Sequence, residues 1–248
     1  MTTSGTTGFN PQFTEIAEEA WERAGREMRT GYDLRTARRS MNMLTIEWAN
    51  RGINLWTIDE GYIDLTKDDA TYSLPADTID VCEMNIRTNA GDASSQSDLS
   101  LNRISLPTYA AIPNKLSTGR PLQALVHRLG QAGTYQSGSL SNNTTTLGTN
   151  VQFLTVWPVP DKSSTYQIYY YRMRRIQDAG TGAQTADMPF RFLPCAVAGL
   201  AYYIAMKVPE LMPRVQMLKQ EYEDQFRLAS EEDREKTAAR FVPSNYRC

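Results

Sequence analysis

Paired carboxylates are the side chains in this sequence whose spacing comes nearest to an acid–base site. Glu18 and Glu19 lie four and three residues before Glu22, which places all three on one side of a helix. A glycoside hydrolase needs one protonated and one ionised carboxyl group facing each other across a cleft. We therefore interpret the three glutamates as a solvated helix face, with a peptidoglycan hydrolase as the alternative.

Metal-binding side chains are sparse. The single histidine, His127, lies in a strand-like run and is interpreted as a surface or interface residue rather than a catalytic one. Asp64, Asp68 and Asp69 lack the spacing of a calcium-binding loop and are interpreted as part of a turn. No cysteines form a Cys-x-x-Cys pair; they are Cys82, Cys195 and Cys248. The sequence predicts no catalytic residues, no metal site and no cofactor.

Basic and aromatic residues alternate near the end of the strand-like region. Arg172, Arg174 and Arg175 follow directly after Tyr169–Tyr171. Such a mixture is found where proteins stack bases and hold phosphates, and equally at protein–protein interfaces. The net charge is −2, and a generic nucleic-acid binder usually carries a basic excess. The three arginines are therefore a candidate protein interface.

The chain of 248 residues is long enough for one large domain or two small ones. It contains no apolar run of roughly 18 residues, so we expect no membrane span.

Hydrophobic spacing predicts helices at both ends of the chain. Asn10 and Pro11 are expected to cap and open a first amphipathic helix that Gly31 closes. A second helix is expected from a cap at Asp33 to a C′ glycine at Gly52. Near the C-terminus, Pro194 is expected to open a buried helix that ends at Pro209, followed by a helix with Pro213 in its first turn.

Between these helices the chain has short β-like runs separated by turn residues, which predict an antiparallel sandwich. The clearest is Tyr166–Ile176, in which Tyr166, Ile168 and Tyr170 alternate with outward positions. The other runs are Leu55–Ile58, Tyr62–Leu65, Tyr72–Leu74, Ile79–Arg87, Leu99–Ile104, Leu122–Arg128 and Val151–Val156. Two polar loops, Asn89–Asp98 and Gly130–Asn150, interrupt them.

Neither pair of helices can bury its apolar stripe alone, so the two chain ends are expected to meet in one bundle. The predicted fold is α+β: a helical bundle from the N- and C-terminal helices, an inserted antiparallel β-sandwich-like domain and an extended C-terminal tail. The expected parts are a flexible N-terminal arm (1–10), the first bundle segment (11–54), the β domain (55–188), the second bundle segment (189–235) and the tail (236–248).

Several segments resemble podoviral head-to-tail adaptor proteins, the tail tubular protein A class of short-tailed phages. The resemblance extends from about Phe13 to Arg234, and the order and spacing of its segments carry it. The segments are Glu19–Gly25, Ala37–Asn42, Glu47–Trp56, Tyr72–Pro75, Ile112–Lys115, Gly119–Pro121, Trp157–Asp161, Pro189–Pro194 and Gly199–Tyr203.

The resemblance implies a non-enzymatic virion component at the head–tail junction, assembled in the host cytoplasm. It implies a ring, usually of about twelve copies, that docks beneath the portal protein and extends the DNA channel without sequence-specific DNA binding. The ring offers a platform to the tail nozzle, a tail tubular protein B-like partner, and often to tail fibres.

On this reading, residues in the C-terminal tail anchor the ring to the portal: Arg240, Phe241, Val242 and Tyr246. Loops 89–98 and 130–150 are expected to face the nozzle or fibres. The alternative function is a virion β-domain that binds a host glycan or receptor through Tyr166–Tyr171.

Overall fold

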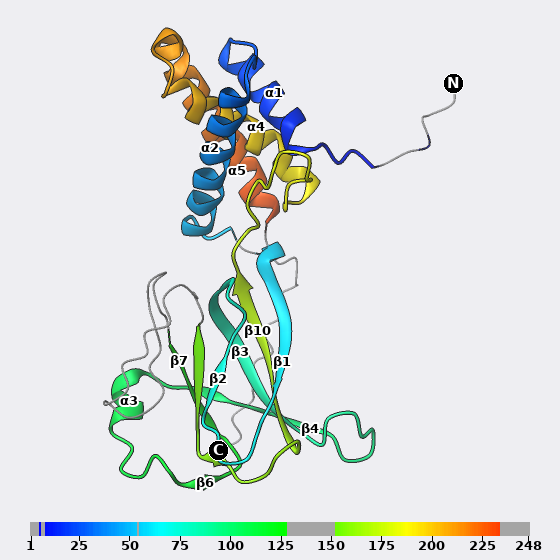
Figure 1. The fold of residues 1–248 in the computed structure, drawn as a ribbon, viewed down its shortest axis with the longest axis vertical. Helices are drawn as coiled ribbons and strands as arrows, with labels where there is room; N and C mark the ends of the chain where they lie inside the picture. The colour runs from blue at the N-terminus through cyan, green and yellow to red at the C-terminus, as the bar shows by residue number, and fades with distance from the viewer. Residues whose placement is uncertain (1–4, 6–7, 54, 128–151, 234–248) are drawn as a thin grey trace, which may run out of the picture. The chain divides into compact units, whose positions relative to one another are not determined.

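The computed structural model describes residue 5 and residues 8–53, 55–127 and 152–233. The chain divides into two compact units, of which one comprises 1–56 and 176–248 and the other 57–175. The first is helical and the second is a β unit inserted into it (Figure 1). The predicted α+β class, with helices from both ends of the chain and β structure between them, is confirmed.

The helical unit is built around α4 (Leu193–Ala205), nine of whose 13 residues are buried. Three other helices pack against it: α1 (Phe13–Ala24), α2 (Gly31–Asn50) and α5 (Val215–Glu232) (Figure 1). The chain reaches α4 through a short 3₁₀ turn, η2 (Phe190–Phe192), and leaves it through η3 (Pro209–Arg214). Because α1 and α2 come from one end of the chain and α4 and α5 from the other, the bundle forms only when both ends meet.

Large aromatic side chains fill the centre of this bundle. Trp48 of α2 and Tyr222 of α5 are 0% and 1% exposed, and the Trp48 indole Nε1 donates to the Tyr222 hydroxyl oxygen over 3.1 Å. Phe192 packs against both Trp48 and Trp56. Burying a side chain of this size stabilises the fold by about 2–3 kcal/mol, so these aromatics hold α2, α5 and η2 together.

The first two helices begin and end elsewhere than predicted. Gln12, not Asn10, is the N-cap of α1, and its backbone N–H donates to Glu15 Oε2 over 2.8 Å. Gly25 (φ 104°), rather than Gly31, ends α1 in the left-handed region that glycine reaches without strain. Thr30 caps α2, and Asp33 lies three residues inside it rather than at its cap.

The remaining helix boundaries are partly as predicted. Gly52 follows the last turn of α2 with φ 87°, and Pro194 lies in the first turn of α4. The helix α4 ends at Ala205, four residues before Pro209, and Pro213 lies in η3 rather than in α5. Proline has no N–H to donate, so the chain continues as a 3₁₀ turn until Val215 opens α5.

The β unit contains two four-stranded sheets. The first has the order β1-β10-β3-β4 and is antiparallel throughout. Its strands are β1 (Ile58–Asp64), β10 (Tyr166–Arg174), β3 (Thr78–Thr88) and β4 (Ser97–Ser100). The second has the order β2-β8-β7-β5. Its strands are β2 (Thr71–Ser73), β8 (Phe153–Trp157), β7 (Gln123–His127) and β5 (Asn102–Arg103).

Both sheets contribute to one core, which contains Ile86 and Ile168 from the first and Leu154 and Val156 from the second. This is the arrangement of a sandwich. Two short pairings are parallel and depart from the predicted antiparallel pattern: β5 with β7, and β6 (Thr118–Gly119) with β9 (Val159–Pro160). The short helix α3 (Leu106–Ala110) was not predicted, and Leu55–Thr57 forms the 3₁₀ turn η1 rather than a strand.

The segment 176–188, which the sequence assigns to the β domain, belongs to the helical unit. Its carbonyl groups accept hydrogen bonds from the start of α1: Phe13 N donates to Gln184 O over 3.0 Å and Thr14 N to Gly182 O over 3.1 Å. Its Ala179 N–H donates to Asn42 Oδ1 on α2 over 3.0 Å. The segment therefore supplies the acceptors that the first turn of α1 lacks.

Candidate interaction surfaces

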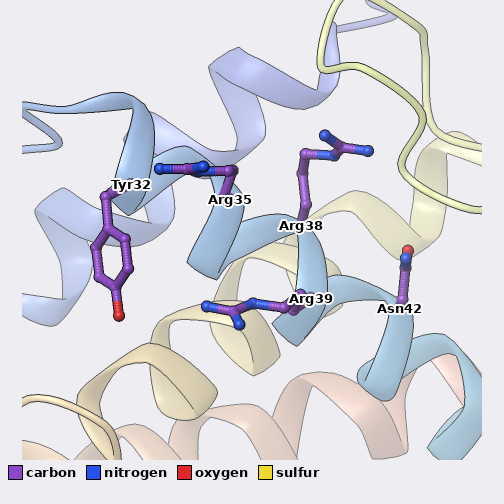
Figure 2. Close-up of a pocket in the computed structure, with 5 residues that line it drawn as sticks. All are labelled: Tyr32, Arg35, Arg38, Arg39 and Asn42. Atoms are coloured by element: carbon purple, nitrogen blue, oxygen red, sulfur yellow. The ribbon is translucent and has the colours of Figure 1, made fainter.

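The outward side of α2 carries a depression of about 400 Å³ lined by Tyr32, Arg35, Arg38, Arg39 and Asn42. The apolar stripe of α2, which includes Ala37, Met41 and Leu44, faces the bundle, so the arginines fall on the other side. Figure 2 shows the guanidinium groups of Arg35 and Arg39 extending toward the Tyr32 end of the helix.

This depression concentrates positive charge. Among the residues that the structure describes, no carboxylate forms an ion pair with Arg35, Arg38 or Arg39. Arg39 Nη2 donates to the Thr36 hydroxyl oxygen over 3.4 Å, and Arg38 Nε is buried without a hydrogen-bond partner in the described part of the chain. A buried donor without an acceptor costs about 1–3 kcal/mol, so this side chain is held here at some cost to the stability of the fold.

Lys207, which follows α4, adds to this charge. Its Nζ donates to the Ser40 hydroxyl oxygen over 2.6 Å. Burial, followed by the nearby Arg39, lowers the pKa of the Lys207 ammonium. Burial is the larger cause, and the smaller contribution of Arg39 reflects two cationic groups lying close together at this surface.

Exposed apolar side chains continue the same side of the helix. Tyr32, Met43 and Ile46 are 63%, 60% and 57% exposed. Together with the arginines they follow helical spacing and form what we call the basic face: Tyr32, Arg35, Arg38, Arg39, Met43 and Ile46. Arginine, tyrosine and methionine are enriched at protein–protein interfaces, and arginine and tyrosine often supply much of the binding free energy there.

The basic face was not among the interfaces expected from the sequence. The signal was present, because Met43 and Ile46 lie off the apolar stripe of the helix and share a side with Arg35 and Arg39. An apolar side chain on a helix's polar side indicates a contact outside the unit.

The outward side of α1 has the opposite charge, and we call it the acidic face: Glu15, Glu18, Glu19 and Glu22, all exposed. Glu19 forms an ion pair with Arg23 over 2.9 Å, and Arg23 also reaches Glu221 of α5. Among the described residues, Glu18 and Glu22 form no ion pair. All four lie on one exposed helix side, as expected for a solvated face.

The candidate interface arginines of the β unit have partners within the chain. Arg172 lies 2.6 Å from Asp77 and 3.5 Å from Asp59, and its side chain is 12% exposed. Arg174 Nε lies 3.0 Å from Asp59. Arg175 has an exposed side chain, and its backbone N–H donates to Asp77 O. Two of the three charges are thus neutralised locally, and the interface role of all three stays a prediction.

The predicted alternation of β10 is confirmed, because Tyr166, Ile168 and Tyr170 are buried in the sandwich core. Tyr169 and Tyr171 point the other way. The Tyr169 hydroxyl donates to Glu60, and the Arg87 guanidinium lies 4.4 Å from its ring centroid. The hydroxyl group and the ring of Tyr169 therefore already contact other residues of this chain.

His127 is half-buried on β7, with Nε2 3.0 Å from the Thr155 hydroxyl oxygen, and burial lowers its pKa. Burial raises the pKa of the Cys195 thiol to about 12, so it stays protonated inside the bundle. Within the described ranges, no group of three or more histidine, cysteine or acidic side chains could hold a metal ion. No helix of the described part is long and apolar enough to cross a membrane.

The predicted portal-binding residues lie outside the described residues, as do the whole 130–150 loop and most of the 1–10 arm. These residues are Arg240, Phe241, Val242 and Tyr246.

An exposed helix face that combines arginines with tyrosine and methionine has the composition of a protein–protein interface. Comparison with known families matches residues 12–244 to a family described as SU10 adaptor protein. The match covers nearly the whole chain, so the chain belongs to the SU10 adaptor protein family, a family of phage adaptor proteins. The comparison with curated proteins gave no match.

Membership of this family supports the adaptor class that the sequence resemblance implies, and it implies a structural, non-enzymatic role in the virion. The narrower tail tubular protein A class is a proposal.

Proposed function

We propose that this chain forms a ring at the head–tail junction of a short-tailed phage, docked beneath the portal and carrying the tail nozzle and fibres. The observation that carries the proposal is the adaptor family match over residues 12–244, which spans both the helical and the β unit. The ring extends the DNA channel. The net charge of −2 supports this role. Each phosphate that a protein neutralises strengthens its binding to DNA, and DNA that passes through a channel must not be bound tightly.

The portal contact is assigned to the C-terminal tail, with Arg240, Phe241, Val242 and Tyr246 as anchors. Deleting residues 237–248 should abolish co-sedimentation of the protein with tail-less, portal-bearing heads. A matched control replaces the same residues by a scrambled tail of identical composition and should also fail to bind. Normal retention of the deletion variant on the heads contradicts the assignment of the tail.

The nozzle and fibre contacts are assigned to the loops of the β unit. The described loop before β4 is a compact turn in which Asp92 accepts hydrogen bonds from Ser94 and Ser95. The Ser95 and Ser94 hydroxyl groups, with the Ser94 backbone N–H, lower the pKa of Asp92 to about 2. A photo-crosslinker at exposed Ala93 should therefore report a well-defined contact. Crosslinks to nozzle or fibre support the proposal, and crosslinks only to portal contradict it.

One observation keeps a glycan-binding β unit as the second candidate. Tyr62 is 63% exposed and Tyr171 is 37% exposed on the outward side of β1 and β10. Exposed tyrosines of this kind are found at binding surfaces with one apolar and one polar side. Two results together would favour this candidate over the ring. The protein would be monomeric in virions, and its affinity for a glycan would decrease when Tyr62 is replaced in Tyr62→Ala.

A further inference from the structure

The basic face of α2 and the acidic face of α1 are two surfaces of opposite charge on one helical unit, and no ion pair joins them in the described part of the chain. Among the described residues, the arginines of the basic face have no carboxylate partner, and Glu18 and Glu22 of the acidic face have no basic partner. Elsewhere in the described chain Arg51, Arg87 and Arg103 have carboxylate partners within 3 Å, whereas the exposed Arg26 and Arg214 form no ion pair with a described residue.

We propose that the basic face of one copy of this chain docks against the acidic face of α1 on the next copy. The inference rests on the proposed ring and names its side contact. A contact between two different surfaces of identical subunits is heterologous, and it closes into a ring when the rotation between neighbours fits. Each subunit then uses both faces once.

The composition of the basic face favours a protein occupant over a nucleic-acid backbone. A phosphate needs only the guanidinium groups, whereas the basic face also exposes Met43 and Ile46, which gain by leaving water. The acidic face supplies a matching row of carboxylates, with Glu15 and Glu22 about 10 Å apart along α1.

The decisive test exchanges the charges of the two faces. Variant A carries Arg35→Glu and Arg39→Glu, so both of its faces are acidic; variant B carries Glu18→Arg, Glu19→Arg and Glu22→Arg, so both are basic. All five side chains are exposed, and near-wild-type circular dichroism and Tm should confirm that both variants fold. The control carries Lys219→Glu and Arg227→Glu on exposed positions of α5, which change the net charge as much as variant A does.

Sedimentation velocity reports the result. The wild type and the control should assemble, while A and B alone should stay monomeric, because like charges face to face raise the dissociation constant by roughly 100-fold or more. An equal mixture of A and B should assemble again, since every contact then joins opposite charges in alternating order. Because A and B must alternate, the mixture gives closed rings when the ring has an even number of copies and open arcs when the number is odd.

Salt gives an independent readout. Assembly of the wild type and of the A–B mixture should weaken together as salt rises, because screening shortens the reach of exposed charges to about 3 Å at 1 M.

Several outcomes overturn the inference: a monomeric wild type, assembly of A or B alone, or a mixture that stays monomeric. If A assembles normally but loses binding to double-stranded DNA in a filter assay, the basic face takes phosphate instead. The proposed function is tested separately by retention of the wild type on tail-less heads. Retention without self-assembly in solution overturns this inference and leaves the proposed function standing.

Discussion

Asp33 shows at the scale of one residue how α2 is made to begin where it does. Its Oδ2 accepts hydrogen bonds from the backbone N–H groups of Arg29 and Thr30, each over 3.2 Å, and Thr30 Oγ1 accepts from Asp33 N over 3.3 Å. Burial by itself raises the pKa of Asp33, but these hydrogen bonds and the charge of Arg26 outweigh it. The net pKa therefore lies below the ordinary value of 3.8.

Replacing this carboxylate should destabilise the helical unit in a pH-dependent way. We expect Asp33→Ala to lower the free energy of unfolding by about 1 kcal/mol at pH 7. A lowered pKa in the folded state means that the ionised carboxylate stabilises above the unfolded pKa, and this contribution is lost as pH falls below 3.8 through the folded value.

Urea denaturation across pH 7 to 3 measures this difference, with Asp224→Ala on the exposed side of α5 as the control. A loss of stability that stays constant below pH 3.8 would contradict the account.

Local sequence signals predicted the caps only in part. Asn10 and Pro11 are a good cap and first-turn pair by local preference, yet α1 begins at Phe13. The reason is distant in sequence: Gln184 and Gly182 supply the carbonyl acceptors for the first N–H groups of the helix. No local pattern carries that information.

At the scale of the element, the sequence predicts that α4 is a buried helix, but it does not predict how closely α4 packs against α2 and α5. Gly199 lies where α4 meets α2 and α5. A Cβ placed there would lie 2.9 Å from both Leu44 methyl carbons and from Tyr222 Cε2. Both neighbours are fully buried, and the Tyr222 hydroxyl is held by Trp48 and Glu47, so neither is free to move.

Gly199→Ala should therefore destabilise the protein by about 1–3 kcal/mol, although alanine is the better helix former by about 1 kcal/mol. Thermal unfolding compares it with Gly31→Ala in the first turn of α2, where an added Cβ meets no atom within 4 Å. We expect the control to be neutral or stabilising. An equal rise in Tm for both variants would show that the helices do not pack this closely.

The elements recovered from periodicity are the long ones. The four main helices and the strand β10 were predicted because their apolar spacing repeats over several turns or pleats. The helix α3 has five residues, none of them buried, so no apolar stripe marks it. The residues of the basic face share one side of α2 by their spacing in the sequence. Only the structure shows that its arginines have no carboxylate partner among the described residues.

For the whole molecule, the chain order of helices, strands and helices predicts an insertion, and the structure has one. The exact exit from the β unit was not predictable. Residues 176–188 are loop-like in sequence, and only their hydrogen bonds to α1 and α2 place them in the helical unit.

If the helical unit has its own core, it should survive loss of the β unit. Ile58 pairs with Met173 across β1 and β10, so the entry and exit strands lie about 5 Å apart. Replacing 58–174 by a short glycine–serine linker should leave a helical protein that unfolds cooperatively by circular dichroism. Residues 1–56 alone, lacking α4 and α5, should be unfolded. A linked variant without a cooperative transition would contradict the independence of the unit.

The central claim is a ring-forming phage adaptor at the head–tail junction. Electron microscopy of the purified protein mixed with the isolated portal of its phage tests it most directly. We predict a ring of this chain seated on the tail-facing end of the portal, continuous with its channel. Portal particles that remain bare at saturating protein, beside free monomers, would contradict the account.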